Sequence, residues 1–98
     1  MNRDSLMDLV MLASAGNPGA ATFCMEAIAT NGFDVSKTVA VIERMMALDI
    51  TGDKLYMIWN DCCNRDTTKA IKVMLENSKD DLLKHLNYEN GRGIPYED

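Results

Sequence analysis

Residues 55–62, LYMIWNDC, carry the clearest helical pattern of this chain. Leu55, Ile58, Trp59 and Cys62 recur at the i, i+3, i+4, i+7 spacing that places apolar side chains on one face of an α-helix. A helix with one apolar face packs that face against other elements. The stretch therefore predicts a helix with one side buried in a core.

Helix-end signals on either side of this stretch predict further short helices. Side chains that accept hydrogen bonds from free N–H groups mark the starts, and glycines that tolerate a left-handed exit mark several ends. The first two helices are predicted over about 4–15 and 18–31, and a third begins after Asp34 or Ser36. The fourth lies between the link 49–52 and the turn 64–66, a fifth follows that turn, and a sixth covers about 79–88 after the capping pair Ser78 and Asp81.

Composition agrees with a helical fold. Hydrophobic residues make up 47% of the 98 residues, and Ala, Leu, Met, Lys and Glu outnumber the strand-favouring Val, Ile and Thr. A chain this short buries one core. We therefore predict an all-α, compact bundle of five to six short helices, with residues 1–90 as a single helical domain.

Residues 91–98 are predicted to form an extended C-terminal tail, since two glycines and a proline oppose further helix. Ile94 and Tyr96 leave two alternatives open. They fold back over the end of the bundle, or they form a short element that becomes ordered on a partner.

The charge balance restricts the classes of partner. The net charge is −5, and residues 1–34 carry one basic residue against four acidic ones. Such a charge opposes nonspecific attraction to nucleic acid and to anionic membranes. Three cysteines that cannot all pair, the lack of a secretory signal and the lack of a long apolar run predict a cytoplasmic protein in a reducing environment, with no membrane association.

The sequence predicts no enzyme, with no catalytic residue, no cofactor and no metal site. Adjacent Cys62 and Cys63 lack the gap that lets two sulfurs reach one zinc ion, and nothing in the spacing pairs either thiol with His85, the only histidine. Paired Asp80 and Asp81 are explained by the positive end of a helix dipole.

The first helix is apolar on nearly every side, because Met7, Met11 and Leu12 fall outside the stripe formed by Leu6, Leu9 and Val10. Two explanations remain open. The helix lies at the centre of the bundle, wrapped by the other five, or Met7, Met11 and Leu12 form an interface for a second copy or another protein. The second explanation leads to our main functional hypothesis, a non-enzymatic protein–protein interaction or self-associating module.

A helix-turn-helix-like DNA-binding regulator is the first alternative. The fourth and fifth helices are joined by the short turn 64–66, as in helix pairs that enter the major groove. The side chains that would contact nucleic acid are Arg65, Thr67, Thr68, Lys69 and Lys72. The acidic chain disfavours this alternative. A second alternative is an inhibitor whose acidic ends occupy a basic site on a nucleic-acid-handling enzyme.

Two short blocks, residues 55–66 and 90–96, resemble small uncharacterised all-helical proteins encoded by Gram-positive bacteria and their phages or mobile elements. The resemblance implies no activity. It suggests only a biological setting, in which an accessory or host-modulating protein is one role.

Overall fold

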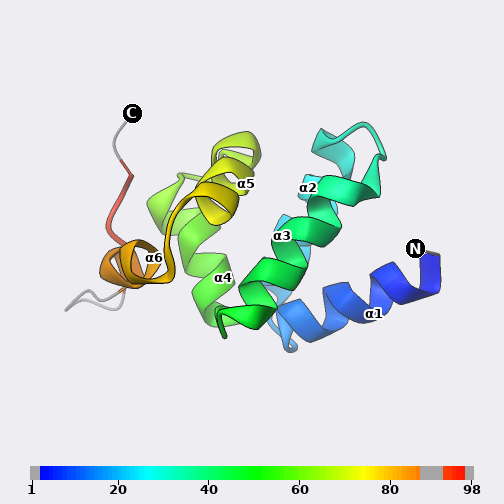
Figure 1. Ribbon diagram of the computed structural model, residues 1–98, viewed down its shortest axis with the longest axis horizontal. Coiled ribbons are helices and arrows are strands. Elements are labelled where there is room, and N and C mark those ends of the chain that lie inside the picture. Colours follow the sequence, from blue (N-terminus) through cyan, green and yellow to red (C-terminus); the bar gives the residue numbers. More distant parts are fainter. Residues whose placement is uncertain (1–2, 87–91, 97–98) are drawn as a thin grey trace.

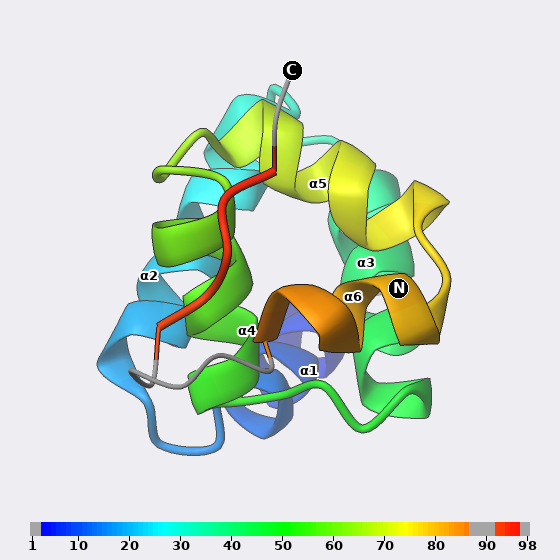
Figure 2. The ribbon, with the colours of Figure 1, turned by 90° about the vertical axis from the view of Figure 1, so that its left-hand side faces the viewer.

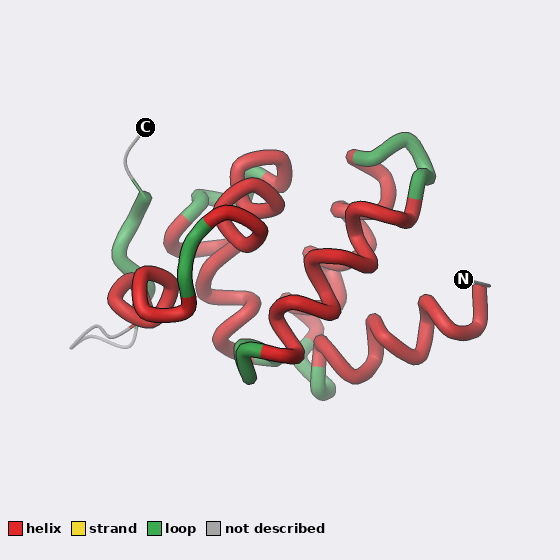
Figure 3. The backbone as a smooth tube through the Cα atoms, viewed as in Figure 1, coloured by secondary structure: helices red, strands yellow, loops and turns green. Residues whose placement is uncertain are grey.

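The structure, a computed structural model, describes residues 3–86 and 92–96. Over these residues the backbone forms α-helices, one π-helical turn and connecting turns, with no strand (Figure 1 and Figure 3). The helices are α1 (Arg3–Ser14), α2 (Pro18–Thr30), α3 (Val35–Ala47), α4 (Asp53–Met57), the π-helix η1 (Ile58–Cys62), α5 (Thr67–Glu76) and α6 (Lys79–Leu86). The predicted all-α bundle is confirmed. None of the described helices combines the length and apolar character that a bilayer span requires.

Side-chain caps start most of these helices where the sequence predicts them. Asn17 Oδ1 accepts a hydrogen bond from Ala20 N at 2.9 Å, with Pro18 at the first helical position. The carboxylates of Asp34 and Asp66 cap α3 and α5 in the same way. Ser78 Oγ accepts from the backbone N–H of the third residue after it at 3.2 Å, as the predicted capping pair requires.

The fourth predicted helix differs from expectation in its second half, which is a π-helical turn. The N–H of Cys63 donates to the carbonyl of Ile58, five residues back, at 3.0 Å. Trp59, Ile58 and Cys62 remain buried, as the spacing predicts. The wider turn therefore changes the hydrogen-bond pattern without turning the apolar face away from the core.

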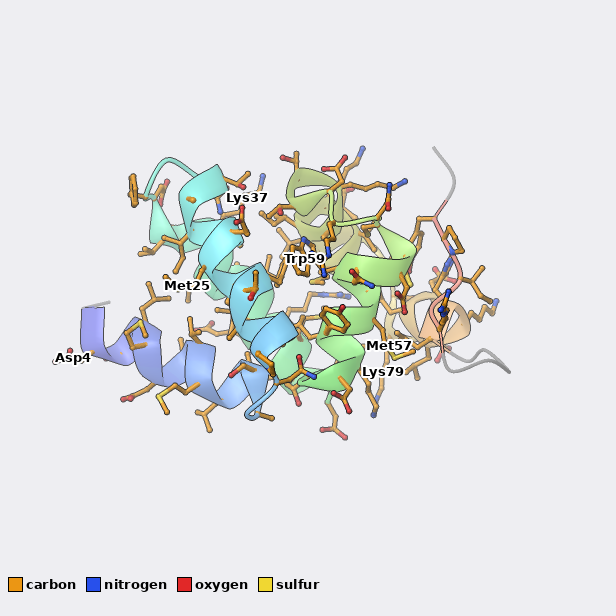
Figure 4. The ribbon with its side chains drawn as sticks, turned by 180° about the vertical axis from the view of Figure 1, so that it is seen from behind. Asp4, Met25, Lys37, Met57, Trp59 and Lys79 are labelled. Atoms are coloured by element: carbon orange, nitrogen blue, oxygen red, sulfur yellow. The ribbon has the colours of Figure 1, made fainter. Side chains whose placement is uncertain are left out.

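Trp59 lies at the centre of the core (Figure 4). Its ring centroid is 5.9 Å from that of Phe23 on α2 and 6.4 Å from that of Tyr56 on α4. Its indole N–H donates to Thr67 Oγ1 at the start of α5, at 3.2 Å. Figure 2 shows the helices arranged around this common core, with α6 and the last described residues on the near side. The largest fully buried side chains are Phe23, Ile42, Met45, Ile50, Leu55, Ile58, Met74 and Leu82.

Helix α1 lies at the edge of the molecule and not at its centre. It packs against α2 and α3 through Leu6, Val10 and Ala13, and its N-terminal end diverges from α3 (Figure 1). The alternative of a central helix wrapped by the other five is therefore wrong. Five short helices leave the outer side of a sixth uncovered, because most of their apolar surface is used in packing against one another.

Residues 92–96 run alongside η1 and α6 (Figure 2). Ile94 N donates to the carbonyl of His85 at 2.7 Å, and Tyr96 N donates to the carbonyl of Cys62 at 2.8 Å. The ring of Tyr96 stacks on that of His85, with centroids 3.6 Å apart. Of the two alternatives for the tail, folding back is observed for Tyr96, whereas Ile94 stays more than one-third exposed. The predicted helix end near residue 88 and residues 91, 97 and 98 lie outside the described residues.

Replacing Tyr96 with alanine should lower the free energy of unfolding by about 1 to 1.5 kcal/mol, because it removes the stacked ring and its burial. Arg92→Ala, an exposed position in the same segment, is the matched control and should change little. Urea denaturation followed by circular dichroism measures both. Equal stability of the Tyr96→Ala variant and the unmodified protein would show that the tail contributes nothing to the fold.

Candidate functional site

Large apolar side chains are exposed mainly on the N-terminal third of the chain. Among the described residues, the exposed large apolar side chains are Met7, Met11, Leu12, Met25, Phe33 and Ile94. Five of these six precede residue 34. Single exposed apolar residues are normal on a protein surface, but a concentration of them marks a contact site.

Three of the exposed residues lie on α1 and follow from its geometry. Successive residues on an α-helix are separated by about 100°, so Met7 and Met11 lie one turn apart along one edge and Leu12 lies on the other edge. Asp4 and Asp8 lie between the two edges, on the side away from the core. Met11 is 67% exposed and Leu12 is 61% exposed. The predicted interface residues are thus all available to a partner.

Met25 adds a fourth side chain, which the sequence reasoning missed. It lies on α2, the helix against which α1 packs, and Figure 4 shows it on the part of α2 nearest the N-terminal half of α1. We call Met7, Met11, Leu12 and Met25 the α1 surface. The signal for Met25 was its position outside the stripe formed by Phe23, Cys24 and Ala27.

Phe33 was also missed. It follows Gly32 in the turn between α2 and α3, is 81% exposed, and has a φ of 68°, in the left-handed region. A bulky residue in this conformation is an outlier. No signal in the sequence indicated this exposure, because the residue directly after a helix-ending glycine often packs an apolar side chain back on the last turn of the helix.

The residues of the DNA-binding alternative are partly used within the chain. Arg65 lies over the Trp59 ring, 5.3 Å from its centroid, and its Nε donates to Asn60 Oδ1 at 2.7 Å. Thr67 Oγ1 accepts the indole N–H. These contacts hold the turn between η1 and α5 against the core.

Lys69, another predicted DNA-contact residue, also makes a contact within the chain. Its Nζ donates to the carbonyl of Tyr96 at 2.7 Å. Thr68 and Lys72 are exposed. Of the five predicted contact residues, three therefore make contacts within the chain and three are exposed, because Arg65 does both.

The cysteines are buried, Cys63 included. Burial raises the pKa of the Cys24 thiol to about 11. Burial, and next the charge of Asp61, raises the pKa of the Cys62 thiol to about 11. The Cys62 sulfur contacts the backbone carbonyl of His85, at 3.7 Å, and not its ring. Within the described ranges, no three His, Cys, Asp or Glu side chains are grouped so that they could hold a metal ion.

All three thiols should react with a disulfide reagent only when the protein unfolds. At pH 8, the Cys24 and Cys62 thiols, with a pKa of about 11, are about 0.1% thiolate, and burial excludes the reagent from all three cysteines. The release of chromophore from Ellman's reagent, with and without guanidinium, measures this. A Thr68→Cys variant, exposed on α5, is the positive control and should release one equivalent at once. A rapid equivalent from the unmodified chain would contradict the burial of the cysteines.

An open pocket of about 510 Å³ lies between α6 and the tail, with Asp81, Lys84, His85 and Tyr96 in its wall. The phenol oxygen of Tyr96 is buried and has no hydrogen-bond partner, and burial raises the pKa of this phenol. Because a carbonyl only accepts, Nδ1 of His85 donates to the carbonyl of Ile94, at 2.7 Å. The imidazole therefore holds the tail in place, through this bond and the stacked ring.

Comparison of the chain with models of protein families, with curated proteins and with solved structures gave no match.

Proposed function

We propose that this chain is a non-enzymatic protein-interaction module that binds its partner through the α1 surface. The observation that carries the proposal is the exposure of Met7, Met11 and Leu12 on a helix that already buries Leu6 and Val10. The exposed three are not needed to form the helix, because lysine, glutamate or glutamine at these positions would favour it equally. Burial of one such side chain in an interface contributes about 1.5 to 3 kcal/mol.

The kind of side chain supports the same proposal. Methionine is unbranched and polarizable, so it adapts to irregular partner surfaces. Three methionines of the described residues are exposed in α1 and α2, whereas Met45 and Met74 are fully buried. Three cysteines cannot all pair within one chain, which favours a reducing compartment, and a cytoplasmic location is therefore part of the proposal.

Site-specific crosslinking tests the proposal. A photoreactive phenylalanine analogue is placed at position 11, or for comparison at position 72, an exposed lysine on α5. In the cells that produce the protein, the analogue at position 11 should give a discrete crosslinked species that position 72 does not give. Adding Met7→Asp should abolish it, and its mass distinguishes a second copy from another protein. Equal crosslinking at both positions would contradict the proposal.

A DNA-binding role stays the second candidate, on the exposed Arg65, Thr68 and Lys72. A gel shift at low salt separates the two roles. Retardation of duplex DNA that is lost in a Lys72→Glu variant would favour the regulator, because Lys72 lies on α5 and outside the α1 surface.

A further inference from the structure

We propose that the partner of the α1 surface is an amphipathic helix with a basic polar face. This inference rests on the proposed function and adds the chemistry of the partner. Its starting point is the distribution of charge. Residues 4–36 contain four acidic residues and no lysine, arginine or histidine, and they include five of the six exposed large apolar side chains.

The carboxylates lie beside the apolar side chains in space as well as in sequence. Asp4 and Asp8 are exposed on α1 between the Met7–Met11 edge and Leu12, and Glu26 is exposed directly after Met25. The next basic residue along the chain, Lys37, lies on the side of the α2–α3 pair that faces away from α1 (Figure 4). Residues 3–36 thus contain four acidic residues and one basic residue, Arg3, which lies one turn before Met7 at the start of α1, so negative charge predominates around the apolar side chains.

Such a surface selects its partner by charge. Lysine and arginine side chains at the border of an interface pair with these carboxylates, whereas acidic side chains there are repelled. A second copy that presented its own α1 surface would bring Asp4 and Asp8 close to the same residues of the first copy. Charge complementarity thus favours a basic partner over self-association through this face.

The spacing of the apolar side chains fits a helix. Met7 and Met11 are one turn apart, and residues one turn apart on a helix lie about 5 to 6 Å from each other. A partner helix with apolar residues at i, i+3, i+4 and i+7 presents a stripe with the same repeat. Its flanking basic residues then reach the carboxylates on either side of that stripe.

The probe for this inference is a synthetic 16-residue peptide of leucine and lysine, with leucines at i, i+3, i+4 and i+7 and a fluorescent label. The matched control peptide has glutamate in place of every lysine. At low salt the lysine peptide should bind the full chain at least about tenfold more tightly than the glutamate peptide, as measured by fluorescence anisotropy. Its affinity should fall as salt is added.

Three double variants identify the surface. Asp4→Asn with Asp8→Asn should weaken binding of the lysine peptide about five- to tenfold. Glu76→Gln with Asp80→Asn makes the same charge change on exposed residues of α5 and α6, and it should alter binding less than about twofold. Met7→Ser with Met11→Ser should weaken binding of both peptides. Circular dichroism checks that each variant folds.

The outcomes separate the inference from the proposed function. If the serine variant weakens binding and the Asp4→Asn, Asp8→Asn variant does not, the surface binds proteins but does not select basic ones, and the inference fails alone. If neither variant changes binding, both proposals fail. Sedimentation equilibrium of the free chain covers the remaining case: a dimer that the serine variant abolishes would assign the surface to a second copy and overturn the inference.

Discussion

Replacing Trp59 with alanine should lower the free energy of unfolding by about 3 to 5 kcal/mol. The indole is 4% exposed and lies among the rings of Phe23 and Tyr56, with Arg65 over its face. Its removal leaves a cavity between α2, α4 and α5 that rigid helices cannot close. Since small domains are stable by only about 5 to 15 kcal/mol, much of the stability of the fold would be lost. Guanidinium denaturation followed by circular dichroism measures the change.

Trp59→Phe is the matched control for this substitution. It keeps an aromatic ring but loses part of the buried area and the hydrogen bond to Thr67 Oγ1. We expect a loss of about 1 to 2 kcal/mol, clearly smaller than for alanine. If alanine and phenylalanine destabilise the protein equally, the cost comes from the hydrogen bond and not from the packed ring.

Gly19→Ala should destabilise the protein by about 2 to 3 kcal/mol, although alanine is the better helix former. Gly19 lies in the first turn of α2, where the ring of Tyr56 covers it. A Cβ at this position would meet three carbons of the ring, including Cγ at its base, at distances that real contacts do not reach. Because Cγ moves only when the side chain rotates about its Cα–Cβ bond, relief requires either a different rotamer of Tyr56 or a separation of the two helices.

The sign of this effect should reverse when the ring is absent. In a Tyr56→Ala background, Gly19→Ala should stabilise the protein by about 0.5 to 1 kcal/mol, through helix propensity alone. Ala29→Gly, at an exposed position of the same helix, measures how much the difference in helix propensity between alanine and glycine changes the free energy of unfolding. A Gly19→Ala effect that is the same in both backgrounds would show that Tyr56 does not restrict this position.

Local signals predicted the helices well, because caps and periodic apolar residues act within a few residues of each other. Asn17, Asp66 and Ser78 start helices through their own side-chain hydrogen bonds. The π-helical turn in η1 could not be predicted in this way. The carbonyl of Cys62 accepts a hydrogen bond from Tyr96, which is remote in sequence, and an apolar stripe looks the same whether its last turn is α or π.

Three of the four residues of the α1 surface were predicted, and Met25 was missed, for a similar reason. Because the first helix is apolar on nearly every side, the sequence identified Met7, Met11 and Leu12 as apolar residues outside the main buried stripe. Only the packing of the helices shows whether other parts of the chain bury them. The position of α1 at the edge of the molecule depends on how five other helices share one core. Sequence periodicity does not contain that information.

The turn between α2 and α3 has a consequence for engineering. Phe33 has a φ of 68°, and a side chain in this region costs about 1 to 2 kcal/mol that glycine avoids. Phe33→Gly should therefore raise the midpoint of thermal unfolding, even after the greater freedom of glycine in the unfolded chain is subtracted. The same substitution would remove the most exposed aromatic ring among the described residues. At this residue heat resistance and the display of an aromatic side chain are in direct competition, so a heat-resistant version of the protein would lack that ring.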